Sequence, residues 1–268
     1  YDTRRGRVFL FGEFNSGARG ETWLWDGSRW TNRTVAGVGP PARYDASVAY
    51  DEVADRVVLH GGFGSEYFQD TWQWTDAGGW VQLTTARNNP ALPSNIYLSG
   101  RLYFDPVRGR VRAFGVCQFT ACANVLELVD DVWTPITVTD PEADGNPAGR
   151  INPALAYDRS RQQVVLFGGA NGGNFRADDQ TWTSDGNSWV RRGPAPAAST
   201  EPALRSGFAC TRVGPQDGPM AMFMHGGFTS PSTWQREGWR YTPSTWTQQV
   251  SHSSTPLPGA SGRASLAW

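Results

Sequence analysis

The chain has 268 residues, of which 13 are Trp, 31 are Gly and 18 are Pro, and only 18% are charged. This composition favours many short strands joined by turns, and the length suits a single all-β domain. The net charge is −1 and the basic residues, all of them Arg, form no run, which argues against nucleic-acid binding by phosphate neutralisation. No apolar stretch reaches the roughly twenty residues that span a bilayer, so we expect no membrane insertion.

One pattern is repeated five times along the chain. Each copy has an apolar strand stopped by glycine, a strand that begins near Thr-Trp, a tight turn, and a strand opened by Trp. The first glycine after the apolar strand and the Trp of the last strand mark each copy: Gly12, Gly61, Gly115, Gly168 and Gly226, and Trp30, Trp80, Trp133, Trp189 and Trp246. Both series step by roughly fifty to sixty residues, a spacing typical of repeat architectures. The repeats therefore fall at about 1–42, 43–94, 95–149, 150–204 and 205–268.

Each repeat predicts four strands, which in the second copy are Arg43–Tyr50, Arg56–Gly61, Thr71–Thr75 and Trp80–Thr84. The second strand is apolar on both faces, which indicates a strand covered by neighbouring sheets. Asp-Gly or a Gly-rich variant separates the third and fourth strands and favours a tight antiparallel hairpin. The Trp of the fourth strand is expected to pack between sheets, since large aromatic side chains dominate core burial.

These residues resemble the bacterial form of the kelch repeat, which runs Tyr-Asp, an apolar strand ending in Phe-Gly-Gly, Asp-Thr-Trp and Asp-Gly-x-x-Trp. The match covers essentially the whole chain, although the third copy is degenerate, with Gly115-Val116 in place of Gly-Gly. The resemblance implies an all-β, five-bladed β-propeller with four antiparallel strands per blade, in one domain over residues 1–268.

The two chain ends bear on whether five blades form a closed ring. Residues 264–268 align with residues 46–50, so the chain ends in a first strand, whereas residues 6–12 begin it with a second strand. We expect the carboxy-terminal strand to complete the amino-terminal blade, because closure removes exposed sheet edges. The alternative is a segment cut from a longer run of blades.

Ligand-binding candidates lie on the long loops, which connect the second strand to the third and one repeat to the next. In a meandering blade both kinds of loop fall on the same face, and recognition usually takes place on such loops. Trp234 fits no repeat position and stands beside Arg236, which favours a sugar or peptide contact. The alternative is that Trp234 caps the edge of its own blade. Tyr67, Phe175 and Arg176 are further candidates on other long loops.

Three arginines, Arg43, Arg150 and Arg205, stand at the start of the first strand of their repeats. They are candidates for a ring at the channel mouth that binds a carboxylate through paired N–H groups. The alternative is a structural role in which each arginine ties loops together. Cys117 and Cys122 lie close enough in one loop for a disulfide in an oxidising compartment, or stay reduced in a reducing one.

No catalytic constellation is evident in the sequence. A Ser elbow, a phosphate loop, a Cys-His pair and a three-His metal set are all missing, so we expect no metal and no cofactor. His60 and His225 occupy the strand position that Phe takes in the other copies and are expected in the core. The acidic loop 140–146 partly resembles a calcium loop, but Ile151 stands where an EF-hand has its bidentate Glu, so we expect a solvated loop.

The sequence thus favours a non-catalytic binding module that recognises a protein or a glycan through the long-loop face. We expect it outside the cell or on a bacterial surface, either as a monomeric propeller or as part of a longer chain. The first alternative is a sugar- or carboxylate-directed enzyme with its site at the channel mouth. The second is a structural part of a larger assembly.

Overall fold

The computed structural model describes residues 1–14, 17–84, 101–115, 124–150, 152–169, 180–192, 202, 209–213, 221–230, 233–234, 237–242 and 245–249. Strands, turns and irregular segments make up all of these residues. Within these ranges there is no helix of the length and apolar character that crossing a bilayer requires. The chain divides into two compact units, Tyr1–Gln118 with Asn124–Ile136, and Phe119–Ala123 with Thr137–Trp268.

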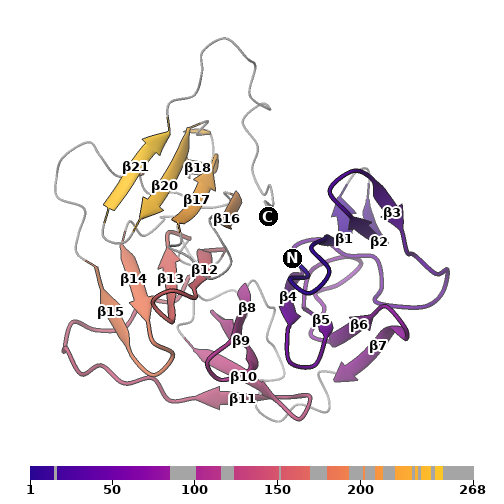
Figure 1. Ribbon diagram of the computed structural model, residues 1–268, viewed down its shortest axis with the longest axis horizontal. Coiled ribbons are helices and arrows are strands. Elements are labelled where there is room, and N and C mark those ends of the chain that lie inside the picture. The colour runs from indigo at the N-terminus through magenta and orange to yellow at the C-terminus, as the bar shows by residue number, and fades with distance from the viewer. Residues whose placement is uncertain are drawn as a thin grey trace. The chain divides into compact units, whose positions relative to one another are not determined.

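The first unit holds three antiparallel sheets, whose strands follow one another in chain order (Figure 1). The first sheet contains β1 (Val8–Phe14), β2 (Ala18–Trp25) and β3 (Trp30–Asn32). The second contains β4 (Ser47–Asp51), β5 (Arg56–His60), β6 (Thr71–Thr75) and β7 (Gly79–Thr84). The third contains β8 (Arg101–Asp105), β9 (Arg110–Phe114), β10 (Val125–Val129) and β11 (Val132–Ile136).

The second unit holds two four-stranded antiparallel sheets and a small hairpin. The first sheet contains β12 (Ala154–Asp158), β13 (Gln163–Phe167), β14 (Thr181–Ser184) and β15 (Trp189–Arg191). The second contains β16 (Ala209–Val213), β17 (Ala221–His225), β20 (Gly238–Thr242) and β21 (Thr245–Gln249). The hairpin β18 (Phe228–Ser230) and β19 (Thr233–Trp234) lies in the long loop between β17 and β20.

The prediction of an all-β, five-bladed architecture is confirmed, because each repeat forms its own antiparallel sheet, and we call these sheets blades 1 to 5. The degenerate third repeat forms four strands like its neighbours. Blade 1 has three strands, as expected for a repeat that begins with its second strand. The strand predicted to complete blade 1, residues 264–268, lies outside the described residues, so closure of the ring stays a prediction.

The predicted start of the first strand in blade 2 was wrong. We expected Arg43–Tyr50, whereas β4 begins at Ser47. Asp45 has a φ of 56°, in the left-handed region that interrupts an extended strand and that Asp tolerates better than most residues. The residues before β4 therefore form a bent segment that pairs with the loop after β5 instead of with β5 itself.

The Asp that follows an aromatic residue in each of the first four repeats is explained by the turn after the first strand. Asp51 accepts hydrogen bonds from the backbone amides of Val53 (3.2 Å) and Ala54 (3.1 Å). The carboxylates of Asp2, Asp105 and Asp158 likewise accept from backbone amides of the turns that follow them. All four side chains are buried. They satisfy amides that the turn would otherwise leave without a partner, which favours Asp at this position of the repeat.

The Trp that opens the fourth strand links neighbouring blades. Trp80 donates its indole N–H to Thr22 Oγ1 of the preceding blade (2.8 Å), and Trp133 donates to Thr71 Oγ1 (2.9 Å). In the second unit Trp246 donates to Thr181 Oγ1 (3.1 Å). These indoles are almost fully buried, so they fill the space between sheets and also find a polar partner there.

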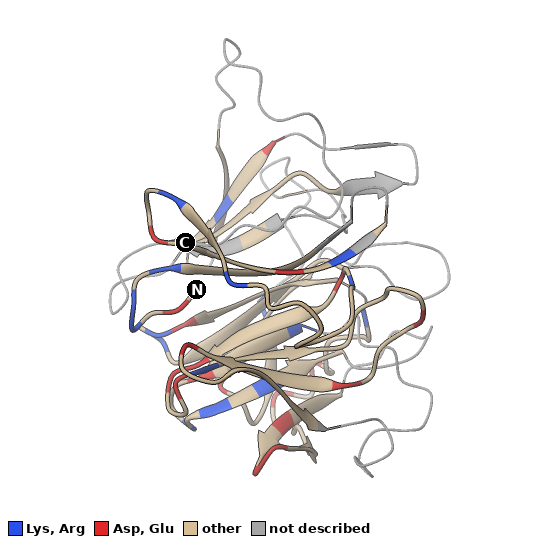
Figure 2. Cartoon of the chain, turned by 90° about the vertical axis from the view of Figure 1, so that its right-hand side faces the viewer, with Lys and Arg blue, Asp and Glu red and all other residues tan. Residues whose placement is uncertain are grey.

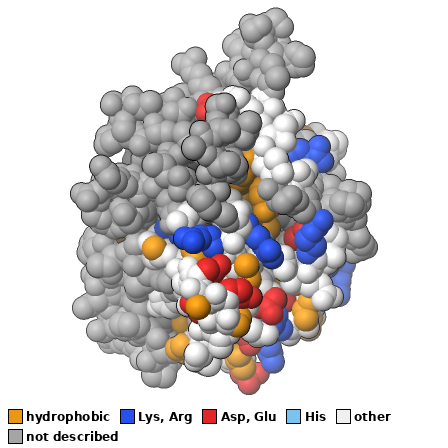
Figure 3. Space-filling model, turned by 90° about the vertical axis from the view of Figure 1, so that its left-hand side faces the viewer, with side chains coloured by type: hydrophobic (Ala, Val, Ile, Leu, Met, Phe, Trp, Pro, Cys, Tyr) orange, Lys and Arg blue, Asp and Glu red, His pale blue; other side chains and the backbone are white. Residues whose placement is uncertain are grey.

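Charged side chains of both signs are interspersed on the described surface. Arg4, Arg5 and Arg7 form ion pairs with Asp2, Asp55 and Asp76 around the amino-terminal turns, where Figure 2 shows basic and acidic residues next to one another. On another face, Figure 3 also shows basic, acidic and apolar side chains mixed over the described part. Neither view shows the field of a single sign that binding to a phosphate backbone favours.

Candidate binding site

Three aromatic side chains meet on the surface of blade 2, on the long loops that the sequence marks for recognition. Tyr44 lies just before β4, while Phe63 and Tyr67 lie in the loop from β5 to β6. The Phe63 ring centroid is 5.4 Å from that of Tyr44 in an edge-on arrangement and 4.5 Å from that of Tyr67. The Tyr67 side chain is 41% exposed. We call these three residues the aromatic patch.

The backbone under the patch is fixed by pairing between the two loop segments. Tyr44 and Phe63 exchange two backbone hydrogen bonds of 2.8 Å, and the Phe68 amide donates to the Gly62 carbonyl at 2.8 Å. A Cβ on Gly62 would lie 2.9 Å from the Tyr44 carbonyl oxygen, and one on Gly64 would lie 2.2 Å from the Ala42 oxygen. Glycine is therefore required where the two segments cross, because any side chain would push them apart.

The buried Arg43, next to Tyr44 in the chain, holds together the loop segments that carry the patch. Arg43, which is 0% exposed, donates Nε–H to the Pro41 carbonyl (3.0 Å) and an Nη1–H to the Gly61 carbonyl (2.9 Å). The same guanidinium binds both carboxylate oxygens of Asp70, at 2.5 and 2.9 Å. It also lies over the Phe68 ring, 3.9 Å from the centroid. Arg43 thus ties three segments of the loop face together.

The ion pair between Arg43 and Asp70 stays charged. Burial raises the pKa of Asp70, but the hydrogen bonds and positive charge of Arg43, with a smaller contribution from the Trp72 indole, outweigh that effect and hold the pKa below its usual value. Breaking such a pair by removing one partner is expensive, since it leaves a buried charge without compensation. The loop face of blade 2 is therefore preorganised, which reduces the entropy lost when a ligand binds.

Arg150 occupies the same position in blade 4 and makes the same main-chain contacts. It is 1% exposed, and it donates to the Ala148 carbonyl (2.9 Å) and the Gly168 carbonyl (3.2 Å). These contacts correspond to those of Arg43 with Pro41 and Gly61. They match the loop-tying interpretation of this repeat position, while a role of Arg43 and Arg150 in ligand binding stays a prediction.

Most of the other predicted site residues fall outside the described part of the chain. Trp234 is on β19, but its side chain lies outside the described residues. The same holds for every atom of Phe175, Arg176, Arg205, Arg236, Cys117 and Cys122. Of the predicted ligand contacts, the structure therefore places Tyr67 in the aromatic patch, Arg43 next to Tyr44 in the chain, and Arg150 at the matching position of blade 4.

The predicted core position of His60 is confirmed, and the acidic loop forms a turn that also accepts a hydrogen bond from the Arg191 amide of β15 through Asp144 (2.9 Å). His60 is 1% exposed and packs edge-on against Trp133, 5.6 Å between ring centroids. Asp140 accepts hydrogen bonds from the backbone amides of Asp144 (3.2 Å) and Gly145 (3.0 Å). Within the described ranges, no three His, Cys, Asp or Glu side chains are grouped so that they could hold a metal ion.

Comparisons of the chain with protein-family models and with curated proteins found no match. The kelch family therefore stays a resemblance, and the geometry alone carries the functional argument.

Sequence reasoning did not find Tyr44 and Phe63 as members of the site. One signal was present, since the residue after Arg43 and the residue after Gly61-Gly62 are aromatic in the second repeat, whereas the fourth repeat has Ile151 and Ala170. Two repeats of similar sequence thus differ at these two positions, and only the second repeat has aromatic residues there. Such a difference indicates that the aromatic residues are not required to build a blade. Their contact depends on a pairing between loops that a period along the chain does not predict.

Proposed function

We propose that this protein is a non-catalytic binding module that recognises a protein or a glycan through the long-loop face of its blades, outside the cell or on a bacterial surface. The aromatic patch of Tyr44, Phe63 and Tyr67 is the observation that carries this proposal. Tyr side chains suit recognition because they offer apolar area and a hydroxyl, and they lose little conformational freedom on binding.

The surroundings of the patch favour binding over catalysis. Asp45 and Glu66, both exposed, are the ionisable side chains adjacent to the patch in the two loop segments, and Asp70 is engaged by Arg43. A general acid or base would need a titratable group positioned against a reacting atom in a cleft. The described patch offers instead three adjoining aromatic rings, one of them exposed, on paired loop segments, which suits an interaction hot spot.

The proposal is tested by equilibrium binding to glycan and peptide arrays, followed by titration of the strongest ligand. Tyr67→Ala should weaken binding by at least about tenfold, because removing an aromatic hot spot typically costs 2 kcal/mol or more. Trp30→Ala is the matched control, since Trp30 is a similarly exposed aromatic residue (46%) in blade 1 outside the patch. The control should leave the affinity unchanged.

Two further variants test the residues that only the sequence identifies. Trp234→Ala and Arg236→Ala test the long loop of the fifth repeat separately, and each should weaken the binding of a ligand that this loop contacts. Equal affinities of Tyr67→Ala and the unmodified chain for every array ligand would remove the patch from the proposal. Binding that survives all three substitutions would rule out the proposed face as a whole.

A further inference from the structure

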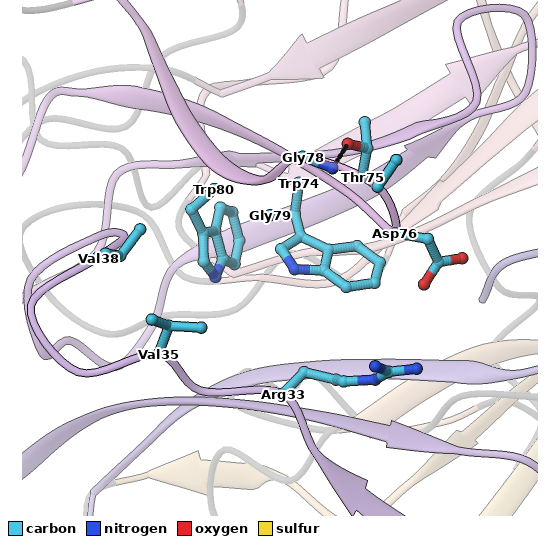
Figure 4. A pocket seen from close by; sticks show the side chains of 10 residues that line it. Arg33, Val35, Val38, Trp74, Thr75, Asp76, Gly78, Gly79 and Trp80 are labelled. Carbon is cyan, nitrogen blue, oxygen red and sulfur yellow. Dashed lines mark hydrogen bonds between the residues drawn. The ribbon is translucent and has the colours of Figure 1, made fainter.

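A second candidate site lies in blades 1 and 2, where a groove of about 300 Å³ opens between a turn after β3 and the hairpin of β6 and β7. Figure 4 shows the indoles of Trp74 and Trp80 side by side on one wall, with Val35, Val38 and Arg33 facing them. The volume is at the lower end of the range for ligand pockets and suits one or two side chains. None of these residues belongs to the aromatic patch.

The indole wall of the groove is rigid. Trp80 donates its N–H to Thr22, and its ring packs edge-on against Phe11 at 5.0 Å. Trp74 packs against Phe9 at 5.1 Å, and the Arg7 guanidinium lies 5.7 Å from the Trp74 ring centroid. The two indoles are only 5% and 7% exposed, so little of either ring is open to solvent. They form an apolar wall but offer no open ring face on which a sugar could stack.

The opposite wall exposes apolar side chains at a turn that is held against Trp80. The Val38 amide donates to the Val35 carbonyl (3.1 Å), and the two valines are 60% and 54% exposed. Gly39 has a φ of 118°, and a Cβ there would lie 2.7 Å from the Trp80 ring. The turn is therefore pressed against the indole, and its two valines face solvent next to the groove, an arrangement favourable for an apolar ligand.

The charge at the groove favours an anion. Arg33 is exposed and forms no ion pair with any carboxylate in the described part of the chain. Asp76, on the same groove, is already neutralised, since Arg5 Nε binds it at 2.8 Å and Arg7 binds it as well. The available charge at the groove is thus the Arg33 guanidinium, which suits a carboxylate.

We propose that this groove binds an apolar carboxylate, such as a peptide segment that carries a branched apolar side chain next to a carboxylate. The apolar side chain lies between the valines of the turn and the indole wall, and the carboxylate pairs with Arg33. This site is independent of the aromatic patch, so either proposal can fail without the other.

Three small probes separate the two features of this ligand. N-acetylleucine has the apolar side chain and the carboxylate, N-acetylleucinamide lacks the charge, and N-acetylglycine lacks the side chain. Titrations of the 268-residue chain, labelled with ¹⁵N at the indoles, should shift the N–H signals of Trp74 and Trp80 with N-acetylleucine. The amide should bind about two- to fivefold more weakly, as expected when an exposed ion pair is lost, and N-acetylglycine about fivefold or more weakly, because it lacks the apolar side chain.

Two arginine variants complete the test. Arg33→Gln should reduce the affinity for N-acetylleucine to that for the amide, whereas Arg29→Gln, a matched change at an arginine of blade 1 whose side chain is 80% exposed, should have no effect. Both positions are on the surface, so neither change should impair folding. Equal binding of acid and amide, an unchanged affinity in Arg33→Gln, or shifts confined to other indoles would each overturn the proposal.

Discussion

Acid should destabilise the first unit through one buried histidine, His60 on β5. Its Nδ1 lies 2.7 Å from Thr71 Oγ1, which also accepts the indole N–H of Trp133 at 2.9 Å. The Thr71 oxygen has two lone pairs, so it can accept from the indole and either accept from or donate to His60 Nδ1, according to the imidazole tautomer. His60 Nε2 is buried and has no hydrogen-bond partner among the described residues, so a doubly protonated ring would leave a buried N–H without an acceptor.

The structure gives the size and sign of this effect. Burial lowers the pKa of His60 to about 3; Asp70 opposes this change and Arg43 adds to it. In the unfolded chain the ordinary pKa is about 6.5. In the unfolded state His60 therefore becomes protonated below about pH 6.5, whereas in the folded state it becomes protonated only near pH 3. The free energy of unfolding should fall by about 1.4 kcal/mol per pH unit within this window, or about 2 kcal/mol at pH 5.

His60→Phe isolates this contribution, because Phe114 and Phe167 occupy the same repeat position in blades 3 and 4 and are fully buried. Urea unfolding of both chains between pH 7.5 and 4.5 should show that the stability difference changes by about 2.7 kcal/mol in favour of the variant at low pH. NMR titration of the His60 ring should show no protonation above pH 4. Parallel stability curves, or a His60 ring that titrates near pH 6, would refute the reasoning.

Two further predictions concern the contacts that join and support the blades. Thr71→Val keeps the shape of the side chain but leaves the Trp133 indole and His60 without their shared partner, so the free energy of unfolding in urea should fall by about 2–4 kcal/mol. The loss should be larger than in Thr22→Val, which affects only Trp80. Equal losses in the two variants would contradict this ranking. Asp70→Asn leaves Arg43 buried without a counter-charge and should lower the free energy of unfolding by about 3–5 kcal/mol. The double variant Arg43→Met with Asp70→Leu should recover part of that loss in thermal unfolding. A double variant less stable than Asp70→Asn would show that the pair itself stabilises the fold.

The blades could be predicted from the sequence because each repeat contains its own strand signals. Thr71–Thr75 was predicted as a strand and is β6 without change, and β5 differs from its predicted bounds only by ending one residue earlier. Strand pairing within a blade is local, since neighbours in the chain are neighbours in the sheet. The third repeat kept its four strands despite losing Gly-Gly and Thr-Trp, because Val125–Val129 still buries its apolar side chains.

The aromatic patch and the groove could not be predicted in the same way. The patch depends on a crossing of two loop segments within the second repeat, and the groove depends on contacts between segments of the first and second repeats. Tyr44 meets Phe63 because Asp45 bends the chain and Gly62 and Gly64 allow a close crossing, which are properties of three-dimensional packing. Arg33 faces Trp74 because the turn after β3 of one blade lies against the hairpin of the next. The period locates each segment within its own blade but not the partner it meets.

A comparison of blades 2 and 4 separates the residues that build the fold from those that offer a surface. Arg43 and Arg150, with the glycines after the second strand, are the same in both repeats and make the same main-chain contacts. The fourth repeat has Ile151 and Ala170 where the second has Tyr44 and Phe63. If repeated positions carry stability and unrepeated ones carry recognition, changes at Arg43 should alter the free energy of unfolding, whereas changes at Tyr67 should alter only affinity. A substitution at either residue that changed the free energy of unfolding and the ligand affinity equally would contradict this assignment of roles.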